Sequence, residues 1–117
     1  MALGDLEREV MDVLWQSYHP LTVRQVHDEL SRERRRDLAY TTVMTVLDRL
    51  AKKGVVRQER ADRAYSYAPM QSREEMTAAL MFDALSATPD QDAALAYFVG
   101  RLPPEALRAA IEAARHQ

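Results

Sequence analysis

The segment from Tyr40 to Lys53 constrains the fold of this sequence more than any other part. Its apolar residues recur at the spacing i, i+3, i+4 and i+7, which is the period of an α-helix with one buried face. These residues are Val43, Val46, Leu47 and Leu50. The segment therefore predicts an amphipathic helix, which Gly54 ends because glycine tolerates a left-handed backbone. No Ser, Asp or Asn precedes Tyr40, so Thr41 is the candidate for the N-terminal cap.

The opposite face of this predicted helix carries hydroxyl groups and charges. Its residues are Thr41, Thr42, Thr45, Asp48, Arg49 and Lys52. Threonine is a mediocre helix former, so three of them on an exposed face need a reason. Small hydroxyls with Arg and Lys can enter a DNA groove, where they reach phosphates and base edges. The alternative is a solvated face without a partner, and this segment alone leaves both open.

Composition limits the class of protein. A chain of 117 residues fits one ordinary domain or two small ones, and 47% hydrophobic with 29% charged residues indicates that it folds. There is no apolar run near 18 residues and no signal-peptide pattern, so neither membrane insertion nor secretion is expected. The absence of cysteine excludes disulfides, thiolate metal sites and a cysteine nucleophile, and it fits a cytoplasmic protein.

The distribution of charge matters more than its total. The net charge of −2 is unusual for a nucleic-acid binder. Residues 39–68, however, hold six basic side chains against three acidic ones, whereas residues 71–117 hold four against seven. Such a dipolar chain can present a basic face to DNA while its other end stays acidic.

The residues before the central helix predict two further helices and a short strand. Residues 3–18 carry apolar side chains at three- and four-residue spacing, which predicts a helix. Leu21 to Val23 is short and contains apolar and β-branched residues, which predicts a very short strand. Thr22 and Gln25 make a capping box, so a second helix should run from there to about Arg32.

A run of six charged residues, Arg32 to Asp37, then leads to the central helix. It is either a solvated loop or a group of cations near the phosphate backbone of a nucleic acid. The sequence favours the solvated loop.

The residues after Gly54 predict a β-hairpin. Val55–Arg60 and Ala64–Ala68 read as strands, Ala61–Arg63 as a tight turn, and Pro69 as the end. The order helix, short strand, helix, helix, hairpin is that of a winged helix-turn-helix, whose third helix enters the major groove. We therefore expect a mainly α fold with a small β-hairpin, in which residues 1–70 form a DNA-binding domain.

The remaining residues predict three short helices. Ser72 and Glu75 make a capping box for the first, Thr88 with Pro89 opens the second, and Pro103–Pro104 starts the third. Three short helices make too thin a core to be stable without a partner surface. We expect residues 71–117 to form a dimerisation domain, because a two-fold dimer also matches a palindromic operator. Its candidate contact residues are Met76, Leu80, Leu95, Phe98, Val99, Leu102, Leu107 and Ile111.

The sequence gives no sign of an enzyme or of a cofactor. His19, His27 and His116 are far apart and have no neighbouring Cys or His, so no metal site is predicted. No nucleotide-binding or nucleophile-elbow motif occurs.

Three stretches together resemble the penicillinase repressor family, which includes the BlaI, MecI and CopY types. Leu6–Trp15 follows the pattern L-E-x-x-V-M-x-x-L-W, and Thr41–Gly54 follows T-T-V-x-T-x-L-x-R-L-x-x-K-G. Thr22–Val26 adds a third match, and the likeness covers essentially the whole chain. The two longer patterns together are specific, and either alone is moderate.

The resemblance implies a cytoplasmic bacterial homodimer that represses genes by binding inverted repeats with TACA/TGTA cores. The β-lactam-responsive branch, of BlaI and MecI type, is the nearest, which implies control of β-lactamase or related cell-envelope stress genes. The copper-responsive branch carries a cysteine cluster, which this chain lacks.

In the β-lactam-responsive branch a membrane sensor with a zinc-protease domain triggers cleavage of the repressor at an Asn-Phe bond. The matching place here is Tyr97–Phe98. Phe98 matches and Tyr97 departs from the pattern, so the family's cleavage rule does not carry over unchanged.

These observations assign roles to eight residues of the predicted DNA-binding domain. Thr41, Thr42 and Thr45 should face base edges or nearby phosphates, and Arg49 and Lys52 should hold phosphates. Arg60 and Arg63 should contact phosphates from the hairpin. Met44 matches a position that contacts DNA in the family, yet it lies beside the apolar stripe, so methyl contact with thymine and packing in the core both stay open.

Two other functions compete with this one. A winged helix can also be a protein-interaction module, and the acidic total charge fits that role. A repressor released by a bound ligand is the second rival, although no residue points to a ligand.

Overall fold

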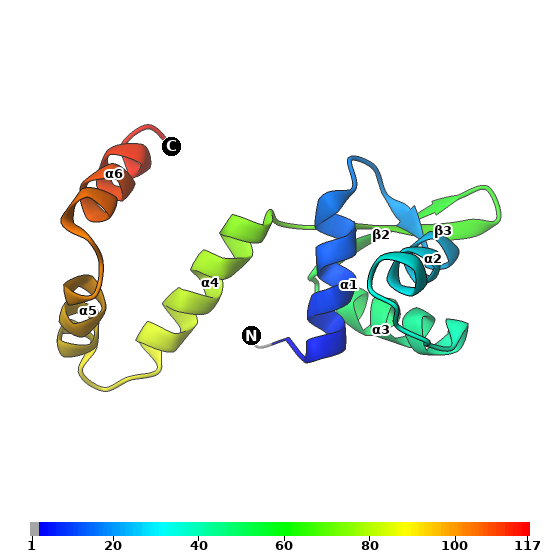
Figure 1. Cartoon of the computed structure of the whole chain (residues 1–117), viewed down its shortest axis with the longest axis horizontal. Helices are drawn as coiled ribbons and strands as arrows, with labels where there is room; N and C mark the ends of the chain where they lie inside the picture. The colour runs from blue at the N-terminus through cyan, green and yellow to red at the C-terminus, as the bar shows by residue number, and fades with distance from the viewer. Residues whose placement is uncertain (1–2) are drawn as a thin grey trace. The chain divides into compact units, whose positions relative to one another are not determined.

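The computed structural model describes residues 3–117, which form six helices and three short strands. Figure 1 labels these elements along the chain. In chain order these are α1 (Asp5–Gln16), β1 (Leu21–Thr22), α2 (Val23–Glu33), α3 (Tyr40–Lys52), β2 (Val56–Ala61), β3 (Ala64–Pro69), α4 (Arg73–Ser86), α5 (Gln91–Gly100) and α6 (Pro104–Ala114). The predicted fold, a winged helix-turn-helix followed by three helices, is confirmed.

The chain divides into two compact units, Met1–Ala78 and Ala79–Gln117. The first unit contains the winged helix and the start of α4, as far as Ala78. The second contains the rest of α4 with α5 and α6. The sequence assigned residues 71–117 together to a dimerisation domain, and that functional boundary stays a prediction.

One core holds the first unit together. Stripes from α1, α2 and α3 meet the inner side of the strands, and the residues with the largest fully buried side chains are Met11, Leu14, Leu30, Leu47 and Leu50. Each stripe has the three- and four-residue spacing seen in the sequence, because one side chain in every three or four points to the same side of a helix.

The sheet is antiparallel with the strand order β1-β3-β2. The hairpin pairs Val56 with Pro69 and Ala61 with Ala64, so its turn is the two residues Asp62 and Arg63. Asp62 has φ 55°, in the left-handed region that such tight hairpins require and that aspartate tolerates better than most residues. Ala61 therefore belongs to the strand and not to the turn, which corrects the predicted boundary.

Local capping signals explain where several helices begin. The Gln25 backbone N–H donates to Thr22 Oγ1 at 3.2 Å, and the Thr22 N–H donates to Gln25 Oε1 at 2.9 Å, which confirms the predicted capping box of α2. The same reciprocal bonds join Ser72 and Glu75 ahead of α4, at 2.9 and 3.0 Å.

Two cap assignments from the sequence are wrong. The cap of α3 is Ala39, which offers no side-chain hydrogen bond, and Thr41 lies inside the helix. The cap of α5 is Asp90, whose carboxylate accepts the Ala93 N–H at 3.0 Å, so Thr88 and Pro89 lie before the helix. A carboxylate is a better cap than a threonine hydroxyl, and Asp90 lies directly before the first residue of α5.

In the second unit no side chain of α5 or α6 is buried, and the same holds for the whole of α4; the structure describes every residue of these helices. None of the helices in the described part of the chain is long and apolar enough to cross a bilayer.

Candidate nucleic-acid interface

The two faces of α3 differ completely in exposure. Val43, Leu47 and Leu50 are 0% exposed and Val46 is 5% exposed. The opposite side is open: the exposed residues are Thr41, Thr42, Met44, Thr45, Asp48, Arg49 and Lys52. Because the buried residues pack against the core, they fix the rotation of α3 about its own axis. The exposed residues therefore point to solvent in a defined direction.

The threonine hydroxyls on α3 are not equivalent. Thr45 Oγ1 donates to the backbone carbonyl of Thr41 at 2.9 Å. A hydroxyl whose hydrogen is used in this way still has lone pairs that accept hydrogen bonds. The outward-facing oxygen of Thr45 is therefore an acceptor, suited to an amino group on a base edge.

The cations of α3 are only loosely engaged. Lys52 Nζ lies 3.1 Å from Asp48 Oδ2, but both side chains are more than half exposed, and such pairs add little stability. A phosphate can displace the carboxylate at small cost. Met44 is 43% exposed and lies outside the core, which leaves its sulfur-bearing side chain free to contact another molecule.

Lys53 and Glu7 attach the end of α3 to α1. Lys53 Nζ lies 2.9 Å from Glu7 Oε2, and the same carboxylate accepts the Gly4 N–H at 3.0 Å. The hydrogen bond from the Gly4 backbone, followed by the hydrogen bond and charge of Lys53, holds the pKa of Glu7 below its ordinary value. Gly54, with φ 78°, then ends the helix as predicted. Lys53 is thus an anchor of the helix, unlike its neighbour Lys52.

His27 attaches the other end of α3. Its Nε2 lies 2.7 Å from the carbonyl oxygen of Leu38, just before the helix begins. The ring also lies 6.1 Å, centroid to centroid, from that of Tyr40. Sequence reasoning missed both Glu7 and His27, because their partners are distant in the chain; the acidic first turn of α1 was the one available signal for Glu7.

The hairpin carries its cations near the tip. Arg63 occupies the exposed two-residue turn, and the Arg60 guanidinium lies 5.7 Å from the centroid of the Tyr65 ring. Arg57 Nε lies 2.7 Å from Glu59 Oε1. The hairpin therefore presents Arg60 and Arg63 toward solvent, while Arg57 forms a surface pair with Glu59.

The charged run Arg32–Asp37 begins inside α2, which ends at Glu33, so only its later part connects α2 to α3, and that part is more than a solvated loop. Arg34 lies 3.4 Å from Asp12, Arg36 lies 3.4 Å from Glu9, and Arg32 lies 2.8 Å from Glu29. Arg34 and Arg36 therefore bind carboxylates of α1. The prediction of a solvated loop omitted these two ion pairs.

The candidate dimerisation residues fall into three groups by exposure. Met76 is partly buried against the core of the first unit. Leu95, Phe98 and Ile111 are exposed by nearly half. The others, Leu80, Val99, Leu102 and Leu107, are of intermediate exposure. The sequence did not select Phe82, which is 68% exposed and belongs to the same apolar group.

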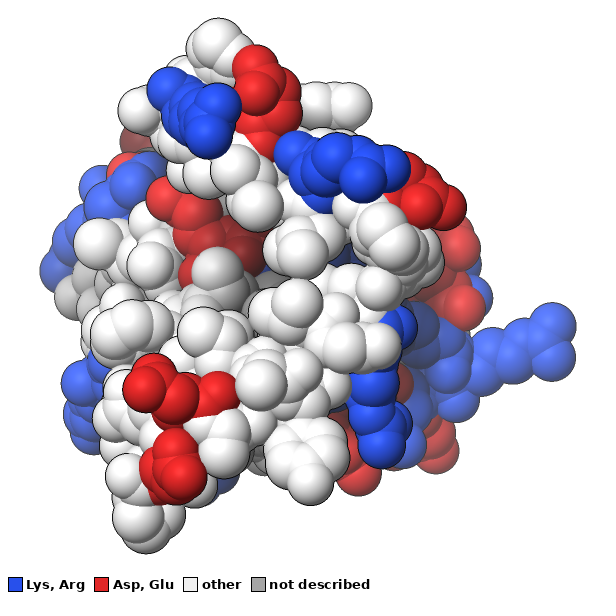
Figure 2. Space-filling view, turned by 90° about the vertical axis from the view of Figure 1, so that its left-hand side faces the viewer, with Lys and Arg blue, Asp and Glu red and all other residues white. Residues whose placement is uncertain are grey.

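Figure 2 shows the molecule turned by 90° about the vertical axis from the view of Figure 1. Uncharged residues cover most of the middle of this view, and acidic and basic groups lie around them. Isolated helices with exposed Leu, Phe and Ile side chains leave apolar surface in water, which a second surface can cover.

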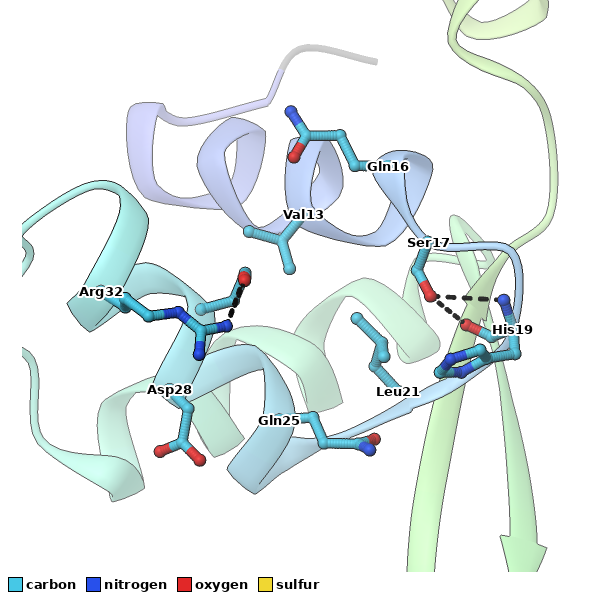
Figure 3. A pocket seen from close by; sticks show the side chains of 9 residues that line it. Val13, Gln16, Ser17, His19, Leu21, Gln25, Asp28 and Arg32 are labelled. Atoms are coloured by element: carbon cyan, nitrogen blue, oxygen red, sulfur yellow. Dashed lines mark hydrogen bonds and ion pairs between the residues drawn. The ribbon is translucent and has the colours of Figure 1, made fainter.

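A hollow of about 390 Å³ lies in the first unit, and none of its lining residues belongs to α3 or to the hairpin. Figure 3 shows side chains from α1, α2 and the segment between them around it, with Ser17 hydrogen-bonded to His19. Its lining is Val13, Gln16, Ser17, His19, Leu21, Gln25, Asp28, Glu29 and Arg32. None of the predicted DNA-contact residues belongs to it.

Known proteins resemble this chain in both sequence and fold. The sequence profile described as penicillinase repressor matches residues 3–112. The transcriptional regulator BlaI of Mycobacterium tuberculosis strain H37Rv is 57% identical over 115 residues, which cover 93% of this chain and 82% of that protein.

Among solved structures, the DNA-binding domain of the repressor BlaI is 30% identical, with a TM-score of 0.54; the match covers 62% of this chain and 85% of that domain. The complex structure of hsRosR-S4 has a TM-score of 0.58 at 19% identity, covering 98% of this chain and 93% of that one, and shows a shared fold. The sequence evidence is decisive: the chain belongs to the penicillinase repressor family and is a transcriptional regulator of the BlaI type, not an enzyme.

Proposed function

We propose that this chain is a cytoplasmic homodimer that represses transcription by binding inverted-repeat operators with TACA/TGTA cores. The regulated genes would be those of β-lactamase or related cell-envelope stress responses. Its partners are double-stranded operator DNA and a second copy of itself, and it needs no cofactor.

The observation that carries this proposal is the open face of α3. Three threonines and two cations project from a helix whose opposite stripe is fully buried. Thr41, Thr42 and Thr45 read base edges or adjacent phosphates, and Met44 offers its methyl group to thymine. Arg49 and Lys52 bind phosphates and fix the position of the helix in the major groove.

The hairpin adds a second contact to the same duplex. Arg60 and Arg63 bind phosphates beside the groove that α3 occupies. Both residues lie at or next to the tip, where their long side chains extend into solvent. These contacts raise affinity for any sequence, because phosphates carry no sequence information.

Dimerisation converts a chain that binds one half-site weakly into a repressor. The exposed apolar residues of α4, α5 and α6 form the contact with the second copy. Two linked readers bind a two-site operator about 10²–10⁴ times more tightly than one reader, without any new contact to DNA.

Proteolysis within the dimerisation region reverses repression. The proposed bond is Tyr97–Phe98 in α5, and Tyr97 is 80% exposed. A membrane sensor protease would act there once α5 unfolds locally, since this ten-residue helix has no buried side chain to hold it. Cleavage separates the helices that join the two copies.

Binding of the purified chain to two duplexes across a range of salt concentrations tests the proposal. One duplex carries the TACA/TGTA inverted repeat, and the other the same bases in scrambled order. We expect tighter binding to the repeat by about 10³ or more, and a linear fall of log affinity with log salt for both. In Arg63→Ala the salt slope should decrease by about one, because one phosphate contact is lost.

The same measurement separates the rival functions. A protein-interaction module binds neither duplex even at low salt. Equal affinity for repeat and scrambled DNA would contradict a role in sequence-specific repression. Binding that a small molecule abolishes, in the absence of proteolysis, would favour a ligand-released repressor.

A further inference from the structure

The start of α3 lacks the local groups that usually hold the first turn of a helix. Its cap is Ala39, which offers no side-chain hydrogen bond, and its first turn contains no acidic residue. By contrast, Thr22 and Asp90 cap α2 and α5 through their side chains. A missing cap weakens the first turn of a helix. The first turn of α3 therefore depends on contacts with other parts of the first unit.

One such contact comes from His27 on α2. Its Nε2 lies 2.7 Å from the carbonyl oxygen of Leu38, two residues before α3 begins. A carbonyl oxygen only accepts, so Nε2 carries the hydrogen and donates it. The other ring nitrogen lies 3.8 Å from Asp28 Oδ1, which is too long for a hydrogen bond. The bond to Leu38 is therefore the contact that orients the imidazole.

Packing holds the same segment. The side chain of Leu38 is partly buried against the core of the first unit, and that of His27 is 26% exposed. The imidazole also lies 6.1 Å, centroid to centroid, from the ring of Tyr40, the first residue of α3. His27 thus contacts the chain on both sides of Ala39, the residue at which the helix starts.

The residues that follow are those proposed to contact bases. Thr41 and Thr42 come directly after Tyr40, so their positions depend on where the first turn of α3 lies. The backbone carbonyl of Thr41 also accepts the hydroxyl of Thr45 at 2.9 Å. A displacement of the first turn would therefore move all three threonines of the open face.

The residues proposed to bind phosphates are attached elsewhere. Arg49 and Lys52 lie in the last turn of α3, and Arg60 and Arg63 belong to the hairpin. Their long side chains can also follow a phosphate over a range of positions, whereas a contact with a base edge requires an exact position. Loss of the His27 contact should therefore affect sequence preference more than binding to DNA in general.

We propose that His27 is a positioning residue that sets the sequence specificity of α3. Its ring holds the carbonyl of Leu38 and contacts Tyr40, and it thereby places Thr41 and Thr42 against the base edges. His27 acts through the first turn of α3 and needs no contact with DNA. This inference rests on the proposed function, because that proposal assigns base contacts to the threonines of α3.

The test compares His27→Leu with wild type as full-length chains. Leucine keeps an apolar side chain beside Tyr40 and removes the N–H donor. Fluorescence anisotropy gives the affinities for the TACA/TGTA inverted repeat and for the same bases in scrambled order. The ratio of the two affinities should fall by about tenfold or more, because a misplaced base contact resembles a mismatched base pair. The salt slope on scrambled DNA should stay the same, because the phosphate contacts remain.

The ratio separates positioning from a general loss of stability. An unfolded fraction lowers the affinity for both duplexes by the same factor, so it cancels. His27→Gln and His27→Asn then test the hydrogen bond itself, since both supply an amide N–H and the side chain of asparagine is one methylene shorter. Glutamine can reach the carbonyl of Leu38 and should restore most of the preference. Asparagine should lose it as leucine does.

The matched control is His19→Leu. His19 belongs to the same unit, and its Nδ1 lies 3.0 Å from a backbone carbonyl, that of the adjacent Pro20. This bond stays within the segment between α1 and β1 and joins it to no second element. His19→Leu should therefore leave the affinity ratio unchanged.

The outcomes separate the two proposals. A wild-type ratio in His27→Leu and His27→Asn, with wild type preferring the repeat, overturns the role of His27 and leaves the proposed function standing. Equal losses in His27→Gln and His27→Asn, or an equal loss in His19→Leu, also overturn it. A wild type that binds the repeat and scrambled DNA equally overturns the proposed function itself.

Discussion

Glu7 shows how a single side chain supports, from behind, the surface that we propose contacts DNA. It is 8% exposed and joins Gly4, at the start of α1, to Lys53, at the end of α3. These contacts hold the pKa of Glu7 below its ordinary value of 4.5. A carboxyl whose pKa falls on folding stabilises the folded state above its unfolded pKa, and this stability is lost as pH falls through the folded pKa.

We therefore expect Glu7→Gln to lower the free energy of unfolding by about 1.5–3 kcal/mol near pH 7, since Lys53 loses a charged hydrogen-bond partner. The difference from wild type should shrink as the pH falls below 4.5, the ordinary pKa of the group. Urea unfolding followed by circular dichroism over a series of pH values measures it. Glu112→Gln, at an exposed pair near the C-terminus, is the control. A difference that is constant over the whole series would contradict this account of Glu7.

Thr45 is the residue whose proposed contact with a base edge can be tested most cleanly by substitution. Thr45→Val removes the hydroxyl and keeps the branched shape, and Thr45→Ser keeps the hydroxyl. We expect Thr45→Val to cost about 1–3 kcal/mol of operator binding, with little change for scrambled DNA, because a base-edge acceptor is lost. Thr45→Ser should bind nearly as wild type does. Equal losses on operator and scrambled DNA, measured by fluorescence anisotropy, would remove Thr45 from the reading surface.

At the scale of elements, the winged helix was predictable because its signals are short-range. The period of Val43, Val46, Leu47 and Leu50 marks the buried side of α3 within one short segment. Thr22 and Gln25 specify the start of α2 from positions only three apart. The exposed face of α3 followed from the buried one, so the candidate DNA-contact residues could be selected from the amino-acid sequence alone.

The supports of that surface could not be predicted in the same way. Lys53 and Glu7 are 46 positions apart, and His27 and Leu38 are 11 apart. Contacts at such separations depend on tertiary packing, and the sequence offers many alternative partners. The predicted cap of α5 was wrong for a local reason. Thr88 and Asp90 are both good caps, and which of them caps the helix depends on the folded backbone.

The caps provide a test at this scale. Thr22→Ala should lower the free energy of unfolding by about 0.5–2 kcal/mol, because the Gln25 N–H loses its acceptor. Thr88→Ala is the matched control, since Asp90 caps α5 in its place. Chemical denaturation of both variants gives the comparison. A loss at Thr88 as large as that at Thr22 would show that the cap of α5 is wrongly assigned.

For the whole molecule, the proposed function depends on two linked copies. A chain truncated after Tyr97 lacks the end of α5 and all of α6. We expect it to sediment as a monomer and to bind the two-site operator about 10²–10⁴ times more weakly than the full chain, while binding a single half-site normally. Sedimentation velocity and operator titration measure both properties. A truncated chain that stays dimeric would contradict the proposed release by cleavage at this bond.

The threonine methyl signals in an NMR titration with operator DNA test the central claim most directly. Half of the six threonines lie on the open face of α3, and Thr22, Thr77 and Thr88 lie elsewhere as internal controls. The account predicts that the methyl signals of Thr41, Thr42 and Thr45 shift on addition of the inverted repeat, and that those of the other three stay in place. Unchanged signals from α3, with shifts at the control threonines, would contradict it.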